Sequence, residues 1–217
     1  IPLAEMTIPG DERQPENAPS EKSPFTDRSP DSRLALVMLD TQRRVCDEYG
    51  DAQTVERLGE ALRVARANKI NVIFVILMFS NGYPELSPSN LQLSGIRSSG
   101  RFTSEDPGAS IHEQLHPVEG ELVLTKKRVS AFVGSGLDVA LKSLSVNQLV
   151  LGGISTSGVV LATMRDAADR DFELTILSDA CADPDPDLHR ILLQRVFPRH
   201  GKVEPVSEWA SRLETPA

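Results

Sequence analysis

The chain has 217 residues, of which 40% are hydrophobic, and its 31 acidic residues outnumber its 23 basic ones, which gives a formal net charge of −8 at pH 7. This length and composition suit one folded domain with a sizeable apolar core, and they exclude wholesale disorder. An acidic surface repels nucleic-acid phosphates and anionic lipid headgroups, so we expect neither a nucleic acid nor a membrane as a partner.

Residues 1–32 differ in composition from the rest of the chain. Six prolines lie among charged and small residues there, and the stretch lacks the apolar residues that a core needs. We therefore expect residues 1–32 to form an extended or disordered arm and residues 33–217 to form the folded domain. The first ten residues show no signal peptide, and Cys46 and Cys181 make no disulfide framework, so a cytoplasmic protein is expected.

Apolar runs and amphipathic stretches alternate from residue 34 onward. The predicted strands are residues 34–39, 72–77, 122–124, 148–151, 172–177 and 203–206. The predicted helices are residues 54–68, 136–144 and 186–196, with one more that continues to residue 170 after a cap at Thr156 or Ser157. This alternation predicts an α/β fold, namely a three-layer αβα sandwich of Rossmann-like type around a six-stranded, mostly parallel sheet. Residues 80–120 show no regular pattern, and a loop region of that length is usually functional.

Two charged residues are expected to meet at one edge of this sheet. Asp40 follows the first predicted strand and Lys126 follows the third, and ligands of such folds bind beyond the carboxyl ends of the strands. Taken alone, Asp40 would be a turn or helix cap and Lys126 part of a solvated turn. Together they predict a carboxylate–ammonium pair in one crevice, which suits general acid–base catalysis. The turn at residues 152–158 adds backbone N–H groups that can bind an anion or a developing oxyanion.

Three stretches resemble elements of the isochorismatase-like hydrolases. Residues 36–42 (LVMLDTQ) resemble the opening strand that ends in Asp-x-Gln, and residues 126–132 (KKRVSAF) resemble Lys-x-x-x-Ser-Ala-Phe. Residues 153–167 (GISTSGVVLATMRDA) resemble Gly-Ile-x-Thr-x-x-Cys-Val-x-x-Thr-x-Arg-Asp-Ala. The elements follow one another in family order between residues 34 and 206.

The resemblance implies a hydrolase that acts on a small molecule, with Asp40 and Lys126 as its catalytic pair. It also implies a homo-oligomer, such as a dimer or a tetramer, and a cis peptide bond between Ile154 and Ser155. No cofactor is implied. No metal site is expected either, because the four histidines are scattered and the aspartates at 183, 185 and 187 predict a turn that leads into a helix.

The chain departs from the family pattern at Val159, which occupies the position of the nucleophilic cysteine. Valine carries neither a proton nor a lone pair, so thioester chemistry at this position is excluded. Isochorismatases proper also lack the thiol, and in them the acid that corresponds to Asp40 protonates a vinyl ether, which then releases pyruvate. Asp40 and Lys126 suffice for that reaction, so we expect hydrolysis of a vinyl ether such as isochorismate.

Two alternatives remain open at this stage. The first alternative is a non-catalytic small-molecule-binding or scaffold member of the family, and the second is an amide or ester hydrolase that uses water or a nearby hydroxyl directly. Ser155, Thr156 and Ser157 have no histidine base close in sequence, so a hydroxyl nucleophile is disfavoured. The two cysteines are expected to be buried and inert.

Further residues are expected to contact the substrate. Five of them lie in the stretches that resemble the family, namely Gln42, Phe132, Ile154, Ser155 and Gly158. The other two, Tyr83 and Asn90, lie in the irregular region at residues 80–120. A dianionic substrate would need basic partners as well. The candidates for that role are Arg43, Arg97, Arg101, Lys127 and Arg128.

Overall fold

The computed structural model describes residues 33–214, so the predicted arm at residues 1–32 lies outside the described residues. The strands are β1 (Leu34–Leu39), β2 (Asn71–Leu77), β3 (Leu122–Lys126), β4 (Gln148–Ile154), β5 (Glu173–Ala182) and β6 (Lys202–Glu204). The α-helices are α1 (Arg43–Tyr49), α2 (Ala52–Ala67), α3 (Leu91–Ser99), α4 (Leu137–Ser143), α5 (Leu161–Ala168), α6 (Pro186–Ile191) and α7 (Val206–Glu214). A π-helical turn, Thr156–Val160, precedes α5, and a second one, Leu192–Val196, follows α6.

The six strands form one sheet in the order β3-β2-β1-β4-β5-β6, and every neighbouring pair is parallel. The predicted fold class is therefore confirmed. The chain moves outward from β1 in one direction to β2 and β3, and in the other to β4, β5 and β6. The carboxyl ends of β1 and β4 thus border the point where the strand order reverses, which is where open α/β sheets bind ligands.

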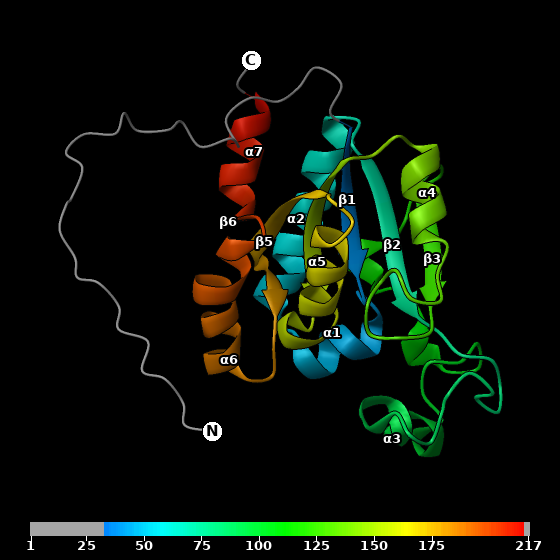
Figure 1. Cartoon of the computed structure of the whole chain (residues 1–217). Helices are drawn as coiled ribbons and strands as arrows, with labels where there is room; N and C mark the ends of the chain where they lie inside the picture. Colours follow the sequence, from blue (N-terminus) through cyan, green and yellow to red (C-terminus); the bar gives the residue numbers. More distant parts are fainter. Residues whose placement is uncertain (1–32, 215–217) are drawn as a thin grey trace, which may run out of the picture.

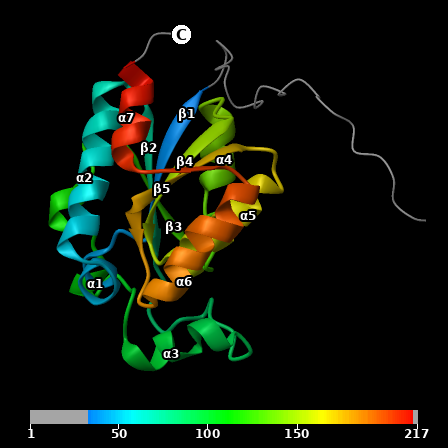
Figure 2. The ribbon, with the colours of Figure 1, turned by 90° about the vertical axis from the view of Figure 1, so that its left-hand side faces the viewer.

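Helices cover both faces of the sheet (Figures 1 and 2). Residues of β1 alternate between the two faces: Ala35, Val37 and Leu39 pack with α4 and α5, whereas Leu36 and Met38 pack with α2 and α7. Because β1 is apolar on both faces, its sequence is a continuous apolar run. Helix α3 stands apart from both layers, beyond the carboxyl ends of the strands (Figure 1).

The structure adds three helices that the sequence pattern did not predict. Helices α1 and α3 bury only two residues and one residue respectively, so neither produces an apolar stripe. Helix α3 did carry a detectable signal, because Asn90 caps its first turn and Gly100 ends it in the left-handed conformation. Helix α7 begins at Val206, which the sequence pattern placed in the last strand.

The predicted cap of the helix after β4 was wrong. Ser155, and not Thr156 or Ser157, precedes the first turn, and its side chain makes no capping hydrogen bond. The Thr156 hydroxyl instead donates to the carbonyl oxygen of Ala182, 3.1 Å away, and so joins the turn to the end of β5. The predicted turn before α6 is confirmed, since Asp185 caps that helix. Within residues 33–214, no helix is long and apolar enough to cross a membrane.

Candidate active site

Asp40 and Lys126 meet at the carboxyl edge of the sheet. The Lys126 Nζ lies 2.9 Å from the Asp40 Oδ2, and the two side chains are 1% and 13% exposed. Asp40 has a φ of 49°, which turns the chain sharply from β1 toward α1. The second carboxylate oxygen of Asp40, Oδ1, is buried and has no hydrogen-bond partner of normal geometry among residues 33–214.

The environment of Asp40 makes its carboxyl a weaker acid than that of a free aspartate. Burial raises the pKa of the Asp40 carboxyl above its usual 3.8, while the charge and the hydrogen bond of Lys126 oppose that rise. The net direction is upward. A carboxyl group with a raised pKa, held beside an ammonium that stabilises its anion, can both donate a proton and take one back.

The loop that follows Lys126 is locked onto α5. The Ser130 hydroxyl donates to Asp166 at 2.7 Å, and the amide of Ala131 donates to the Thr163 hydroxyl at 3.0 Å. The Lys126 ammonium also donates to the carbonyl oxygen of Arg128 at 3.0 Å. Two of the stretches that resemble the family, residues 126–132 and 153–167, therefore hold each other in place and fix the position of the ammonium.

The ion pair lines a cavity of about 190 Å³. Four residues predicted for the site, all from the end of β4 and the turn after it, line the same cavity: Ile154, Ser155, Gly158 and Val159. The Ile154–Ser155 peptide bond is cis, as the resemblance implies. The cavity thus brings the Asp40–Lys126 ion pair and Val159 together.

Other lining residues were not predicted from sequence. They are Val45 and Tyr49 of α1, Leu77 at the end of β2, Gln92 and Leu93 of α3, Phe102 and Val129. Most of them are apolar. Apart from Leu77, they come from short helices and loops whose position is decided by packing between distant segments, so no local pattern marks them as part of a site.

Gln42 and Phe132, both predicted to contact the substrate, do not line the cavity. Gln42 is fully buried, and its side-chain amide donates to the carbonyl oxygens of Leu77 and Ala109 and accepts from the amide of Leu77. Gln42 therefore joins the end of β2 to the turn at Ala109. The Phe132 ring packs in the core against Phe172, with the Arg170 guanidinium 4.7 Å from its centroid.

Tyr83 and Asn90 lie away from the cavity as well. Tyr83 is 6% exposed, and its hydroxyl donates to the carbonyl oxygen of Arg101. The Asn90 side chain accepts a hydrogen bond from the amide of Leu93 and caps α3. Both residues hydrogen-bond to the backbone next to or at residues that line the cavity, namely Phe102 and Leu93. They therefore help to position these lining residues without contacting the cavity themselves.

None of the five basic residues proposed to bind a dianion lines the cavity. Arg97 donates to the carbonyl oxygens of Tyr83 and Leu86, and Arg101 pairs with Glu48. Lys127 lies 3.4 Å from Glu85 and also donates to the carbonyl oxygen of Met78. Within residues 33–214, the cation that lines the cavity is Lys126, which is already paired with Asp40.

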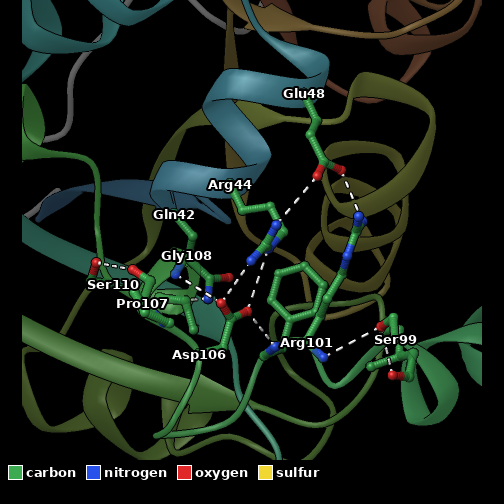
Figure 3. A network of polar contacts seen from close by, with 12 residues as sticks. Gln42, Arg44, Glu48, Ser99, Arg101, Asp106, Pro107, Gly108 and Ser110 are labelled. Carbon is green, nitrogen blue, oxygen red and sulfur yellow. Dashed lines mark hydrogen bonds and ion pairs between the residues drawn. The ribbon is translucent and has the colours of Figure 1, made fainter.

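A chain of charged residues joins α1 to the loop that carries Phe102 (Figure 3). Arg44 binds Asp106 at 2.8 Å and lies 3.6 Å from Glu48, which in turn binds Arg101 at 2.9 Å. Asp106 also accepts hydrogen bonds from the amides of Phe102 and Gly108. The Arg44 hydrogen bond is the main reason that the pKa of Asp106 is lowered to about 2. This network holds one wall of the cavity against α1.

The two thiols lie outside the cavity lining. Burial raises the pKa of Cys46 and of Cys181 to about 12, so both thiols are protonated and unreactive at neutral pH. Among the residues that the structure describes, no cysteine lines the cavity. No three His, Cys, Asp or Glu side chains within residues 33–214 are grouped as a metal site would require.

The comparisons with known proteins give the family. Residues 34–208 match the isochorismatase domain. The chain belongs to the isochorismatase family. A solved structure of a cysteine hydrolase from Pseudomonas syringae pv. phaseolicola has a similar fold, with a TM-score of 0.78 and 23% identity over 86% of this chain and 96% of that chain.

The relatives of this isochorismatase-family protein include proteins whose names describe an activity. The ureidoacrylate amidohydrolase RutB of Methylobacterium radiotolerans is 28% identical over 191 residues, which is 79% of this chain and 71% of the relative. The N-carbamoylsarcosine amidase of an Arthrobacter species is 29% identical over 152 residues, which is 69% of this chain and 56% of the relative. Family membership and these names support a hydrolase.

Proposed function

We propose that this protein hydrolyses a vinyl ether by acid–base catalysis, without a covalent intermediate. The observation that carries the proposal is the buried Asp40–Lys126 pair, which shares its cavity with Val159. The pair supplies a proton donor, and the valine supplies no nucleophile. A vinyl ether is the substrate in this family that needs the first and not the second.

The proposed reaction begins with Asp40 in its protonated form. The protonated carboxyl gives its proton to the terminal carbon of the enol ether, which produces an oxocarbenium ion and leaves Asp40 as a carboxylate beside the Lys126 ammonium. Water then adds to the cation and returns a proton to the carboxylate. The resulting hemiketal breaks its C–O bond and releases an alcohol and a ketone, which is pyruvate when the ether is an enolpyruvyl ether.

The lining of the cavity supports a substrate of low charge. Lys126 is the lining cation among the described residues, and when Asp40 is protonated its ammonium can pair with one carboxylate of a substrate. A second carboxylate on the substrate would have no basic partner in this lining, and burying an unpaired charge is costly. We therefore favour an enolpyruvyl ether with one carboxylate over the dicarboxylate isochorismate.

The test is pyruvate release from a panel of enolpyruvyl ethers with one or two carboxylates, isochorismate included. We expect Asp40→Asn to abolish release, whereas Asp47→Asn, which changes an exposed aspartate of α1, should leave it intact. Full activity of the Asp40→Asn variant would eliminate the proposal. A ligand recovered unchanged, with no turnover anywhere in the panel, would support a binding protein instead.

Amide hydrolysis is the second candidate, and the names of the two amidase relatives favour it. With Val159 in the cavity, water would have to attack the amide carbonyl, and Asp40 would act as the base and not as the acid. This candidate predicts amide turnover that rises as Asp40 ionises. Release of ammonia from ureido and carbamoyl substrates by the wild-type protein would establish it.

A further inference from the structure

The hydroxyl of Ser155 is an unused polar group in the cavity. Ser155 lines the cavity together with Asp40 and Val159, and it is only partly buried. Its Oγ has no hydrogen-bond partner among residues 33–214, and it does not cap the turn that it precedes. The neighbouring hydroxyl, that of Thr156, is fully buried and is engaged by Ala182 and His189. The two hydroxyls are adjacent in sequence and have different roles.

Gly158 keeps the space in which this hydroxyl lies. A Cβ added to Gly158 would be 2.6 Å from the Ser155 Oγ, and the next nearest atom, the Ser155 Cβ, is 4.0 Å away. The φ of Gly158 lies outside the left-handed region, so its backbone does not require glycine. The contact with the Ser155 hydroxyl is therefore what a side chain at position 158 would disturb.

We propose that Ser155 binds the water molecule that attacks the substrate, a role that rests on the hydrolysis proposed above. A reaction without a covalent intermediate needs a water held in place, and an ordered water needs at least two polar partners. Ser155 Oγ provides one partner, and the carboxyl group of Asp40, whose side chain lines the same cavity and is 13% exposed, provides the other. After Asp40 has given its proton to the enol carbon, the carboxylate takes a proton from this water as its oxygen bonds to the cation.

Ser155 lacks the partner that would make it a nucleophile itself. A serine hydroxyl attacks efficiently only when a base removes its proton. His189 is part-buried, and its Nδ1 lies 2.8 Å from the Thr156 Oγ1, so this imidazole serves the neighbouring residue and not Ser155. Without such a base, the Ser155 hydroxyl can hold a water by a hydrogen bond but is not activated to attack the substrate.

The kinetic test combines four variants. We expect Ser155→Ala and Gly158→Ala each to lower kcat for the enol ether by about tenfold, which is the effect of losing one hydrogen bond of about 1.4 kcal/mol. The double variant Ser155→Ala/Gly158→Ala should be no slower than Ser155→Ala, because the added Cβ then meets no hydroxyl. Ser157→Ala removes a hydroxyl of the same turn that does not line the cavity, and it should keep wild-type kcat.

Three results would overturn the role of Ser155. They are an unchanged kcat in Ser155→Ala, a double variant whose losses multiply, and a covalent adduct on Ser155 in the mass spectrum of the protein quenched during turnover. Melting temperatures of all four variants separate loss of catalysis from loss of folding, since the proposal predicts small shifts for each single variant.

A crystal structure tests the water site independently of turnover. In the wild-type protein we expect an ordered water within hydrogen-bond distance of Ser155 Oγ, and we expect Gly158→Ala to displace it. An empty position in the wild-type crystal would overturn the proposal. If no enol ether is hydrolysed, the proposed function fails, while the crystal still decides whether Ser155 holds a water.

Discussion

Lys126 and Asp40 form a buried ion pair of 2.9 Å, although the whole of β2 lies between the strands that carry them. The pair exists because β1 and β3 end at the same edge of the sheet, where Leu39 is in register with Val75 and Lys126 is in register with Leu77. Neither charge would be stable at this depth without the other.

The pH dependence of turnover separates the two candidate reactions. The pKa of Asp40 is raised above 3.8. If Asp40 is the acid of ether hydrolysis, kcat must fall as pH rises through this raised value, because the proton to be donated is lost. If Asp40 is the base of amide hydrolysis, kcat must rise over the same range. A pH profile of kcat for each substrate class decides between them.

Removing the ammonium should destabilise the fold. We expect Lys126→Met to lower the free energy of unfolding at pH 7 by about 3 kcal/mol, because it leaves the Asp40 carboxylate buried without a cation. The pKa of Asp40 in the folded state then rises further above its unfolded value, so the folded state binds more protons and stability falls as pH rises from about 4.

The measurement is urea unfolding of Lys126→Met at pH 4.5 and pH 7. The matched control is Lys142→Met, which breaks an exposed pair with Asp138 and should change the free energy by less than about 0.5 kcal/mol. If Lys126→Met lowered the free energy of unfolding equally at the two pH values, the destabilisation would not come from an unpaired Asp40 carboxylate.

Asp106→Asn should loosen the wall of the cavity. The change removes the charged bond to Arg44 and should cost about 1–2 kcal/mol while raising KM more than it lowers kcat, because Phe102 loses its support. The pKa of Asp106 is about 2 in the folded protein, against a usual value of 3.8 for an aspartate. Its stabilisation is therefore present above pH 4 and is lost as pH falls from about 4 toward 2.

Stability curves against pH for wild type and Asp106→Asn check this assignment. The two curves should converge in acid. The exposed Asp138→Asn variant should follow the wild-type curve closely. Parallel curves down to pH 2 would contradict the role assigned to the Arg44–Asp106 bond.

Val159→Cys should create a reactive thiol. The new side chain would face the cavity beside the Asp40–Lys126 pair, and a nearby ammonium lowers the pKa of a thiol. The wild-type protein is the control for labelling of the two native cysteines. Cys46 and Cys181 have pKa values of about 12 and should alkylate slowly at pH 7. Iodoacetamide labelling followed by mass spectrometry should find one rapidly modified cysteine in the variant. Labelling no faster than in wild type would show that position 159 is not beside an activating cation.

The sequence by itself determined the sheet and the two charges at its edge. Strands buried on both faces must be apolar at every position, so β1, β2 and β4 were visible as continuous runs, and Asp40 and Lys126 stood out where runs ended. Their meeting followed from parallel topology alone.

Only the tertiary structure decided which other side chains reach the cavity. Phe132 and Gln42 were selected by family pattern, yet one packs in the core and the other joins backbone segments. Tyr49 and Phe102 line the cavity but lie in α1 and in a loop, which bury too few residues to leave a periodic signal. A cavity lining depends on how separate elements pack against one another, and that information is absent from any single stretch of chain.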